Sequence, residues 1–128
     1  MKKRYIIILA VIVTIILVGF IAFNRINANL EALIETPISE VNPSSLEDGI
    51  YEGSYSSFPV SVDVAVTISS GVITSIEITK HDNGQGEPAE VIIESVIDLQ
   101  SVQVDAIAGA TYSSVVILLA ISDALNNN

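Results

Sequence analysis

The chain has 128 residues, enough for one small domain and an appendage, and it carries 15 acidic but only five basic side chains. After Asn24, two cationic residues stand against all 15 acidic ones, a net charge of −13, so nucleic acid is not expected as a partner. With no Cys and a single His, the chain lacks the residues for disulfides, iron–sulfur clusters or a His-rich metal site.

The N-terminus has the features of a membrane anchor. A basic tip, Lys2 to Arg4, precedes 19 uncharged residues from Tyr5 to Phe23, a run long enough to cross a hydrocarbon core as a helix. The positive tip predicts that the N-terminus stays in the cytoplasm and that the rest of the chain lies outside. A cleaved signal peptide is the alternative, but its apolar region is usually only ~7–15 residues. Residues 1–26 are therefore expected to be a cytoplasmic tip and a transmembrane signal anchor, and the chain to be a single-pass protein of the cell membrane.

Residues 27–47 are expected to be an acidic extracytoplasmic linker. Residues 27–34 could prolong the anchor helix, and Pro37 and Pro43 then break regular structure. If residues 35–47 were extended they would reach at most ~45 Å, which would let the domain swing. The alternative is that part of this segment packs on the domain.

Residues 48–128 are expected to form the folded domain. Gly49 to Tyr55 alternates enough for a short strand, and Val60 to Ile68 alternates apolar and polar residues with a clean period of two. After turn residues at Ser69 to Gly71, a returning strand is expected over Val72 to Thr79. These segments predict a small antiparallel sheet.

Two further expectations concern the third strand and the residues that follow it. Val72, Ile76 and Ile78 are expected on one face of it. The segment from His81 to Gly86, with its two glycines, is expected to be a loop.

Two helices complete the expected domain. Glu87 to Asp98 has Pro88 in a first turn and apolar residues recurring at three and four. Ser113 to Leu125 is apolar on nearly every side yet too short to span a bilayer, so it is expected to be the core helix. The fold class is therefore α+β: a small antiparallel sheet with two packed helices, preceded by one N-terminal transmembrane helix.

The stretch from Asp105 to Ser114 joins a short extended segment, residues 102–104, to the last helix. Gly109 and Ala110 leave the backbone uncrowded, and Thr111 and Ser113 place hydroxyls at the helix mouth. The first N–H groups of a helix lack intrahelical partners and carry a positive partial charge, so a phosphate is welcome there. The same residues also fit a plain helix N-cap, which is the commoner use of this pattern.

This stretch resembles the flavinylation motif of FMN-binding domains, in which an Asp is followed, three residues on, by Ser/Thr-Gly-Ala-Thr. Such domains occur within the sodium-translocating NADH:quinone reductase and within the Rnf complex. The resemblance extends over roughly Asp48 to Leu125 and includes the opening Asp48 to Gly53. It implies FMN attached as a phosphoester to Thr111. Ala108 stands where Ser or Thr is usual in the family.

The resemblance also implies a wider cofactor-binding site. Its members would be Asp105, Gly109, Ala110, Tyr112, Ser113 and Ser114, around Thr111 as the covalent acceptor. In the family the loop that follows the third strand approaches the flavin and often begins with His, which makes His81 a further candidate; a solvated turn is the alternative. No catalytic residue and no metal site are expected.

The implied function is a membrane-anchored extracytoplasmic electron carrier. A substrate-specific enzyme is less favoured, because the chain has no dinucleotide Gly-rich fingerprint and no evident nucleophile set. The implied partners are a flavin transferase that installs FMN, a membrane redox protein or quinone-linked donor, and an external electron acceptor. The alternative is a non-redox envelope binding module with a decayed or non-covalent flavin site, of which Ala108 would be the sign.

Overall fold

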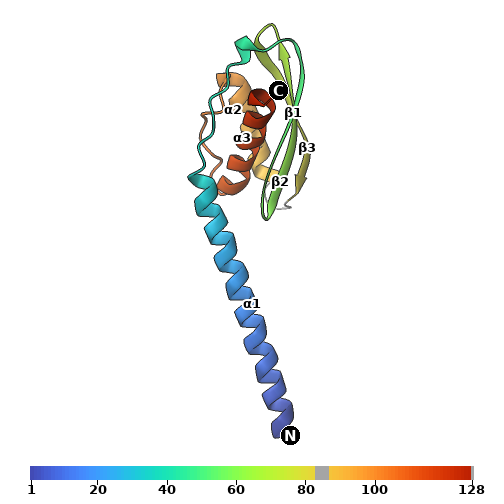
Figure 1. The fold of residues 1–128 in the computed structure, drawn as a ribbon, viewed down its shortest axis with the longest axis vertical. Coiled ribbons are helices and arrows are strands. Elements are labelled where there is room, and N and C mark those ends of the chain that lie inside the picture. Colours follow the sequence, from blue (N-terminus) through green and yellow to red (C-terminus); the bar gives the residue numbers. More distant parts are fainter. Residues whose placement is uncertain (83–86, 128) are drawn as a thin grey trace.

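The computed structural model describes residues 1–82 and 87–127 (Figure 1). The elements are α1 (Lys2–Ile34), the 3₁₀ turn η1 (Pro43–Ser45), β1 (Gly49–Ser57), β2 (Val60–Ser69), β3 (Val72–Asp82), the 3₁₀ turn η2 (Glu87–Val91), α2 (Ile92–Leu99) and α3 (Thr111–Asn126). The strands form an antiparallel sheet in the order β1-β2-β3. Helix α3 packs across β1 and β2, and α2 lies against β3. The predicted α+β class, with a long apolar helix in front, is confirmed.

Strand β2 forms the middle of the core. Its alternate residues point toward the helices and are at most 1% exposed, as the period of two predicted: Val60, Val62, Val64, Val66 and Ile68. On the edge strand β1 the side chains that face the helices are only half-buried. The sheet therefore has one covered face and one solvated face.

Strand β3 departs from the prediction in two ways. The pairing between β2 and β3 shifts at Thr67/Ile68 and again at Asp63/Val64, and each irregularity changes which side chains face the core. Ile73 is buried and Val72 is exposed, so the expected inward position of Val72 is wrong.

The strand also continues to Asp82. His81, which was expected to begin a loop, lies inside β3 opposite Val62. The remainder of the expected loop, residues 83–86, lies outside the described residues.

Helix α3 is the core helix, as expected. It is apolar on most sides and nearly all of it is buried between the sheet and the rest of the domain. It approaches β1 closely at Gly53, where a Cβ atom would collide with the backbone of Ala120 and Ala124. The glycine therefore permits the contact of helix with strand at this point. The helix begins at Thr111, two residues before the predicted start.

The other predicted helix is split. Residues Glu87–Val91 form η2, and only Ile92–Leu99 are α-helical. The α2 helix ends at Gln100, which has a left-handed backbone conformation, φ 52° and ψ 38°. The Gln100 side-chain amide accepts a hydrogen bond from Ile73 N (2.7 Å) and donates one to Ile73 O (2.9 Å), which pins the end of α2 to β3.

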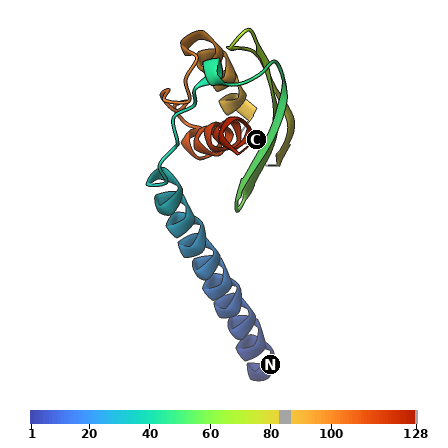
Figure 2. The same ribbon diagram turned by 45° about the horizontal axis from the view of Figure 1, so that its top comes forward.

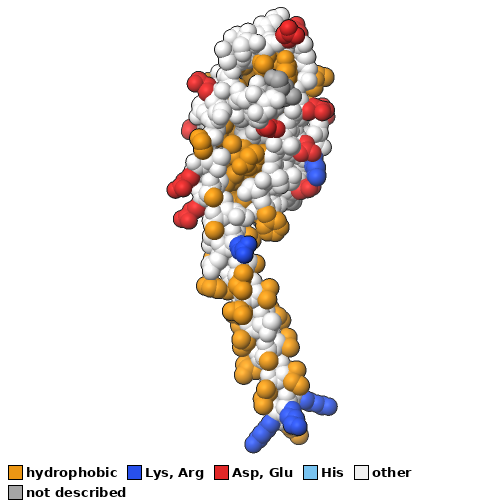
Figure 3. Space-filling model, viewed as in Figure 1, with side chains coloured by type: hydrophobic (Ala, Val, Ile, Leu, Met, Phe, Trp, Pro, Cys, Tyr) orange, Lys and Arg blue, Asp and Glu red, His pale blue; other side chains and the backbone are white. Residues whose placement is uncertain are grey.

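Helix α1 is one continuous helix that leads to the domain (Figures 1 and 2). It is long and apolar enough to cross a membrane, and its apolar side chains are exposed along the stem, with Lys and Arg gathered at the free end (Figure 3). Near its other end, Leu33 is buried in the core. The predicted prolongation of the anchor helix through residues 27–34 is thus present.

Residues 35–47, expected to be an extended linker, pack on the domain. Val41 is buried in the core. Ile38 O accepts a hydrogen bond from Gln103 Nε2 (2.8 Å), and Ser39 O accepts one from Ser122 Oγ (3.1 Å). The segment is therefore held against the folded domain, which matches the alternative that part of it packs on the domain.

Candidate functional site

The Asp105–Ser114 stretch forms the turn that leads into α3. Thr111 is the first residue of the helix and is exposed, and Ala110 stands at the N-cap position without a side chain that could accept a hydrogen bond. The positive end of α3 is therefore not capped by a side chain, and the exposed Thr111 is the first residue at this end. Thr111 was expected to precede the helix, but the helix begins at Thr111 itself, two residues before the predicted start at Ser113.

Gly109 gives the turn its shape. Its φ of +80° is in the left-handed region that favours glycine, and the next amide, Ala110 N, donates to Ile107 O at 2.9 Å. No atom lies within 4 Å of the place where a Cβ of Gly109 would be. The backbone before Thr111 is thus open to an approaching group.

Ser114 holds this turn from inside. Its hydroxyl donates to Ala110 O at 2.7 Å and accepts from Ile107 N at 3.0 Å, and the residue is fully buried. Ser113 is also buried. Of the three hydroxyl side chains of Thr111, Ser113 and Ser114, only that of Thr111 faces solvent. The bracing role of Ser114 was missed by sequence reasoning, because it depends on a contact seven residues back along the chain.

Tyr112 ties the start of α3 to the sheet. Its hydroxyl donates to Phe58 O at 2.7 Å and lies 2.9 Å from Ser57 Oγ, both at the turn between β1 and β2. Phe58 O also accepts a hydrogen bond from Asn29 Nδ2 of α1 at 3.4 Å. The predicted site therefore lies at the end of the domain that adjoins the anchor helix (Figures 1 and 2).

His81 lies at this same end of the sheet. Because it pairs with the inward-facing Val62, its side chain points to the covered face, where it is only 6% exposed. Its Nδ1 is 2.9 Å from Glu90 Oε1. Its Nε2 is buried and has no hydrogen-bond partner within residues 1–82 and 87–127. Such an unpaired buried atom requires an explanation, and a ligand is one.

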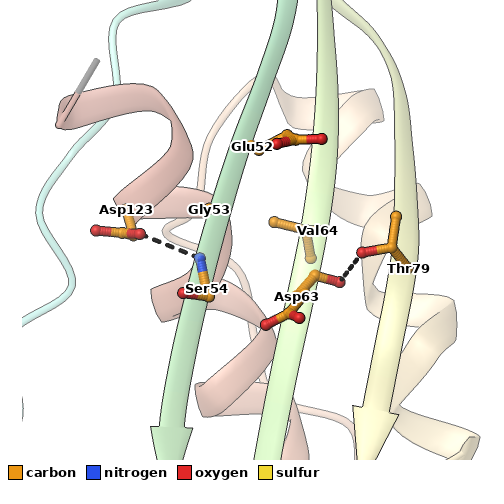
Figure 4. Close-up of a pocket in the computed structure, with 7 residues that line it drawn as sticks. All are labelled: Glu52, Gly53, Ser54, Asp63, Val64, Thr79 and Asp123. Carbon is orange, nitrogen blue, oxygen red and sulfur yellow. Dashed lines mark hydrogen bonds between the residues drawn. The ribbon is translucent and has the colours of Figure 1, made fainter.

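The remaining motif residues are on the surface. Asp105 and Ala108 are both exposed. A cavity of about 380 Å³ lies elsewhere, along β1 and β2, where the Asp123 and Asp63 side chains come close to Gly53 and Ser54 (Figure 4). Asp123 accepts a hydrogen bond there from Ser54 N at 3.1 Å. The carboxylates of this cavity do not suit a phosphate, so the uncapped start of α3 is the better candidate for binding an anionic cofactor.

Comparison with protein families identifies the family of the domain. The FMN-binding domain family matches residues 57–126, more than half of the chain, so the chain belongs to this family and FMN is its cofactor. The matched range includes the whole turn, α3 and His81.

One curated relative is an uncharacterized protein of Treponema pallidum (strain Nichols). It is 26% identical over 101 residues, which are 77% of this chain but only 28% of that protein. The chain thus spans little more than a quarter of the relative's length. No solved structure matches.

The residues at the start of α3 fit FMN. An uncrowded glycine, free helical N–H groups and an exposed hydroxyl are close together in the sequence. His81 Nε2, which has no partner among the described residues, lies at the same end of the sheet. An FMN-binding domain behind a helix that could cross a bilayer fits a membrane-anchored flavin-binding protein.

Proposed function

We propose that the protein is an electron carrier that holds FMN through a phosphoester to Thr111, outside the cytoplasmic membrane. The observation that supports this most is the contrast between the three hydroxyls at the start of α3. Thr111 is exposed, and its hydroxyl forms no hydrogen bond to any described residue, whereas Ser113 and Ser114 are buried. A flavin transferase can reach only a side chain that is on the surface.

The residues around Thr111 have separate roles in this proposal. The first N–H groups of α3 would bind the phosphate oxygens, and the left-handed Gly109 would let the phosphate approach the backbone. Ser114 would not touch the cofactor; it fixes the turn through Ala110 and Ile107. Asp105 is exposed beside the turn, where it could contact the transferase.

FMN supplies one- and two-electron transfer when bound, and attachment by the phosphate leaves the isoalloxazine ring free for it. The chain's own contribution is to retain the cofactor outside the cytoplasmic membrane, where a dissociable cofactor would be lost by dilution. His81 Nε2 would offer a polar contact to the cofactor from the covered face of the sheet. The electron donor would be a membrane redox protein or a quinone-linked protein, and the acceptor an external one.

The test is mass spectrometry of the full chain co-expressed with an active flavin transferase. Intact mass should show one FMN increment, and peptide analysis across Gln100 to Leu125 should place it on Thr111. The Thr111→Ala variant should lose the increment completely, Thr111→Ser should retain part of it, and Ser113→Ala, the matched control in the same helical turn, should keep it. FMN on Ser113 or Ser114 would overturn the assignment.

The second candidate is a binding module without covalent flavin, and Ala108 is the observation that favours it. This position lacks the usual hydroxyl of the family motif. Because Ala108 is exposed, a serine there would fit without repacking. The Ala108→Ser variant should therefore keep the melting temperature of the parent and show equal or higher FMN occupancy by intact mass. An absence of FMN from both proteins, with an active transferase present, would favour the binding module.

A further inference from the structure

The tip of the β1–β2 hairpin is joined to two helices through one carbonyl group. Phe58 O accepts hydrogen bonds from Tyr112 Oη of α3 and from Asn29 Nδ2 of α1. The anchor helix, the hairpin and the helix that begins with Thr111 therefore meet at this point. The Phe58 side chain is not used in this junction, and it is 70% exposed.

The position of Asn29 along α1 sets the height of the hairpin tip above the bilayer. The uncharged run ends at Phe23, and Asn29 lies six residues further along the same continuous helix. Six residues at 1.5 Å each are about 9 Å. The polar headgroup layer on each side of the hydrocarbon core is about 5–8 Å thick. If the hydrocarbon boundary lies near Phe23, the hairpin tip is at the surface of the bilayer.

The charge pattern of the hairpin agrees with that location. Residues 53–62 carry no charge, although they belong to a segment of the chain with a net charge of −13. The acidic residues that flank this run, Glu52 and Asp63, lie further from the hairpin tip along β1 and β2. A phenylalanine exposed to water at the end of an uncharged hairpin is unfavourable in solution, and the same residue is well suited to the headgroup–acyl boundary.

We propose that the Phe58–Pro59 tip of the β1–β2 hairpin inserts into the lipid interface of the bilayer that α1 crosses. This second contact, beside the anchor helix itself, holds the start of α3 toward the membrane surface. The lipid contact does not depend on the proposed function. If the proposed function also holds, the contact orients the cofactor toward an electron donor in the membrane.

The chain contains no Trp, so a single introduced tryptophan reports its own surroundings. Phe58→Trp is the probe, and Ile50→Trp is the matched control, because Ile50 is 69% exposed and lies on β1 at the opposite end of the sheet. Full-length protein without FMN is placed in phosphatidylcholine vesicles with brominated acyl chains. The emission of the Phe58→Trp variant should be quenched several-fold more than that of the Ile50→Trp variant. Equal quenching of the two variants would overturn the proposal.

A second probe guards against a folding defect in either tryptophan variant. The chain also lacks Cys, so Phe58→Cys and Ile50→Cys can each carry a polarity-sensitive fluorophore. A blue shift for the Phe58→Cys variant alone, in vesicles of pure lipid, supports the lipid contact. A shift that appears only when native membrane proteins are present would instead identify a protein partner and would overturn the proposal. Because no FMN is used, a failure of flavin attachment leaves both measurements unchanged.

Discussion

Ser114 shows how a buried hydroxyl can shape a modification site without being modified. Its side chain bridges Ala110 O and Ile107 N, so removing it leaves the Ile107 N–H without this partner. We predict that Ser114→Ala lowers the free energy of unfolding by about 1–3 kcal/mol, the usual cost of an unsatisfied buried donor. Urea unfolding of the detergent-solubilised chain measures this. Ser113→Ala is the control, and equal effects of the two variants would contradict the bracing role.

The contacts of the His81 side chain allow a second prediction. Its Nδ1 is paired with Glu90, and its Nε2 has no partner in the described part of the chain. If that nitrogen faces the cofactor, His81→Leu should shift both the visible absorption maximum and the midpoint potential of the flavinylated protein. Lys80→Leu, the exposed neighbour on β3, should change neither. An unchanged spectrum in His81→Leu would mean that Nε2 serves a different group.

At the scale of elements, the contact between α3 and β1 depends on one glycine. A Cβ at Gly53 would meet the backbone of Ala120 and Ala124, which cannot move aside without shifting α3. Gly53→Ala should therefore reduce the free energy of unfolding by about 1–3 kcal/mol, the typical cost of overpacking. Gly49→Ala on the same strand meets nothing within 4 Å and should be nearly neutral in the same urea titration. A neutral Gly53→Ala would show that α3 does not approach β1 this closely.

The sequence predicted those elements whose signal is local. The alternation in β2 and the apolar run of α3 each identify an element without any knowledge of its neighbours. Among the inward positions predicted for β3, only Val72 was wrong, because the irregular pairing at Thr67/Ile68 comes from contacts between strands. His81 was assigned to a loop for the same kind of reason: Asn83 and Gly84 resemble a turn, and nothing local shows that pairing with Val62 continues the strand.

The candidate site likewise contains some features that the sequence could identify and others that it could not. The pattern around Gly109 and Thr111 is contiguous in sequence, and it could be recognised as a phosphate-binding turn or a flavinylation motif. Contacts between distant residues could not be recognised. Tyr112 was expected to contact the cofactor, and the hydrogen bond of its hydroxyl to Phe58 links residues 54 positions apart. The burial that separates Ser113 from Thr111 likewise depends on how α3 packs against the sheet.

At the scale of the whole molecule, the basic tip of α1 predicts the direction of insertion. Since the chain has no native Cys, single cysteines can report topology. Glu94→Cys, on an exposed position of α2, should react with a membrane-impermeant maleimide on intact cells. Lys3→Cys should react only after lysis. The reverse pattern of labelling would place the domain in the cytoplasm.

The packed segment from residue 35 to residue 47 limits how the folded domain can move on its anchor. Val41 is buried, and Ile38 and Ser39 accept hydrogen bonds from residues of the domain. Swinging over the ~45 Å that an extended segment would allow therefore requires these contacts to break first. In the described conformation the domain is held against the C-terminal end of α1, so under the proposed function an electron donor or acceptor would have to come to it.

The Gln100 amide would matter for copies of the chain that the proposed anchor holds in one membrane. It occupies both the N–H and the C=O of Ile73 on the outer edge of β3, and Asp123 occupies the Ser54 N–H on the opposite edge. A bilayer confines its proteins to a plane, where the domains of neighbouring copies collide frequently through their lateral surfaces. Sheet edges that already hold hydrogen bonds from their own chain offer fewer free groups for another strand to join. Such domains can collide in the plane without adding strands to one another at these positions.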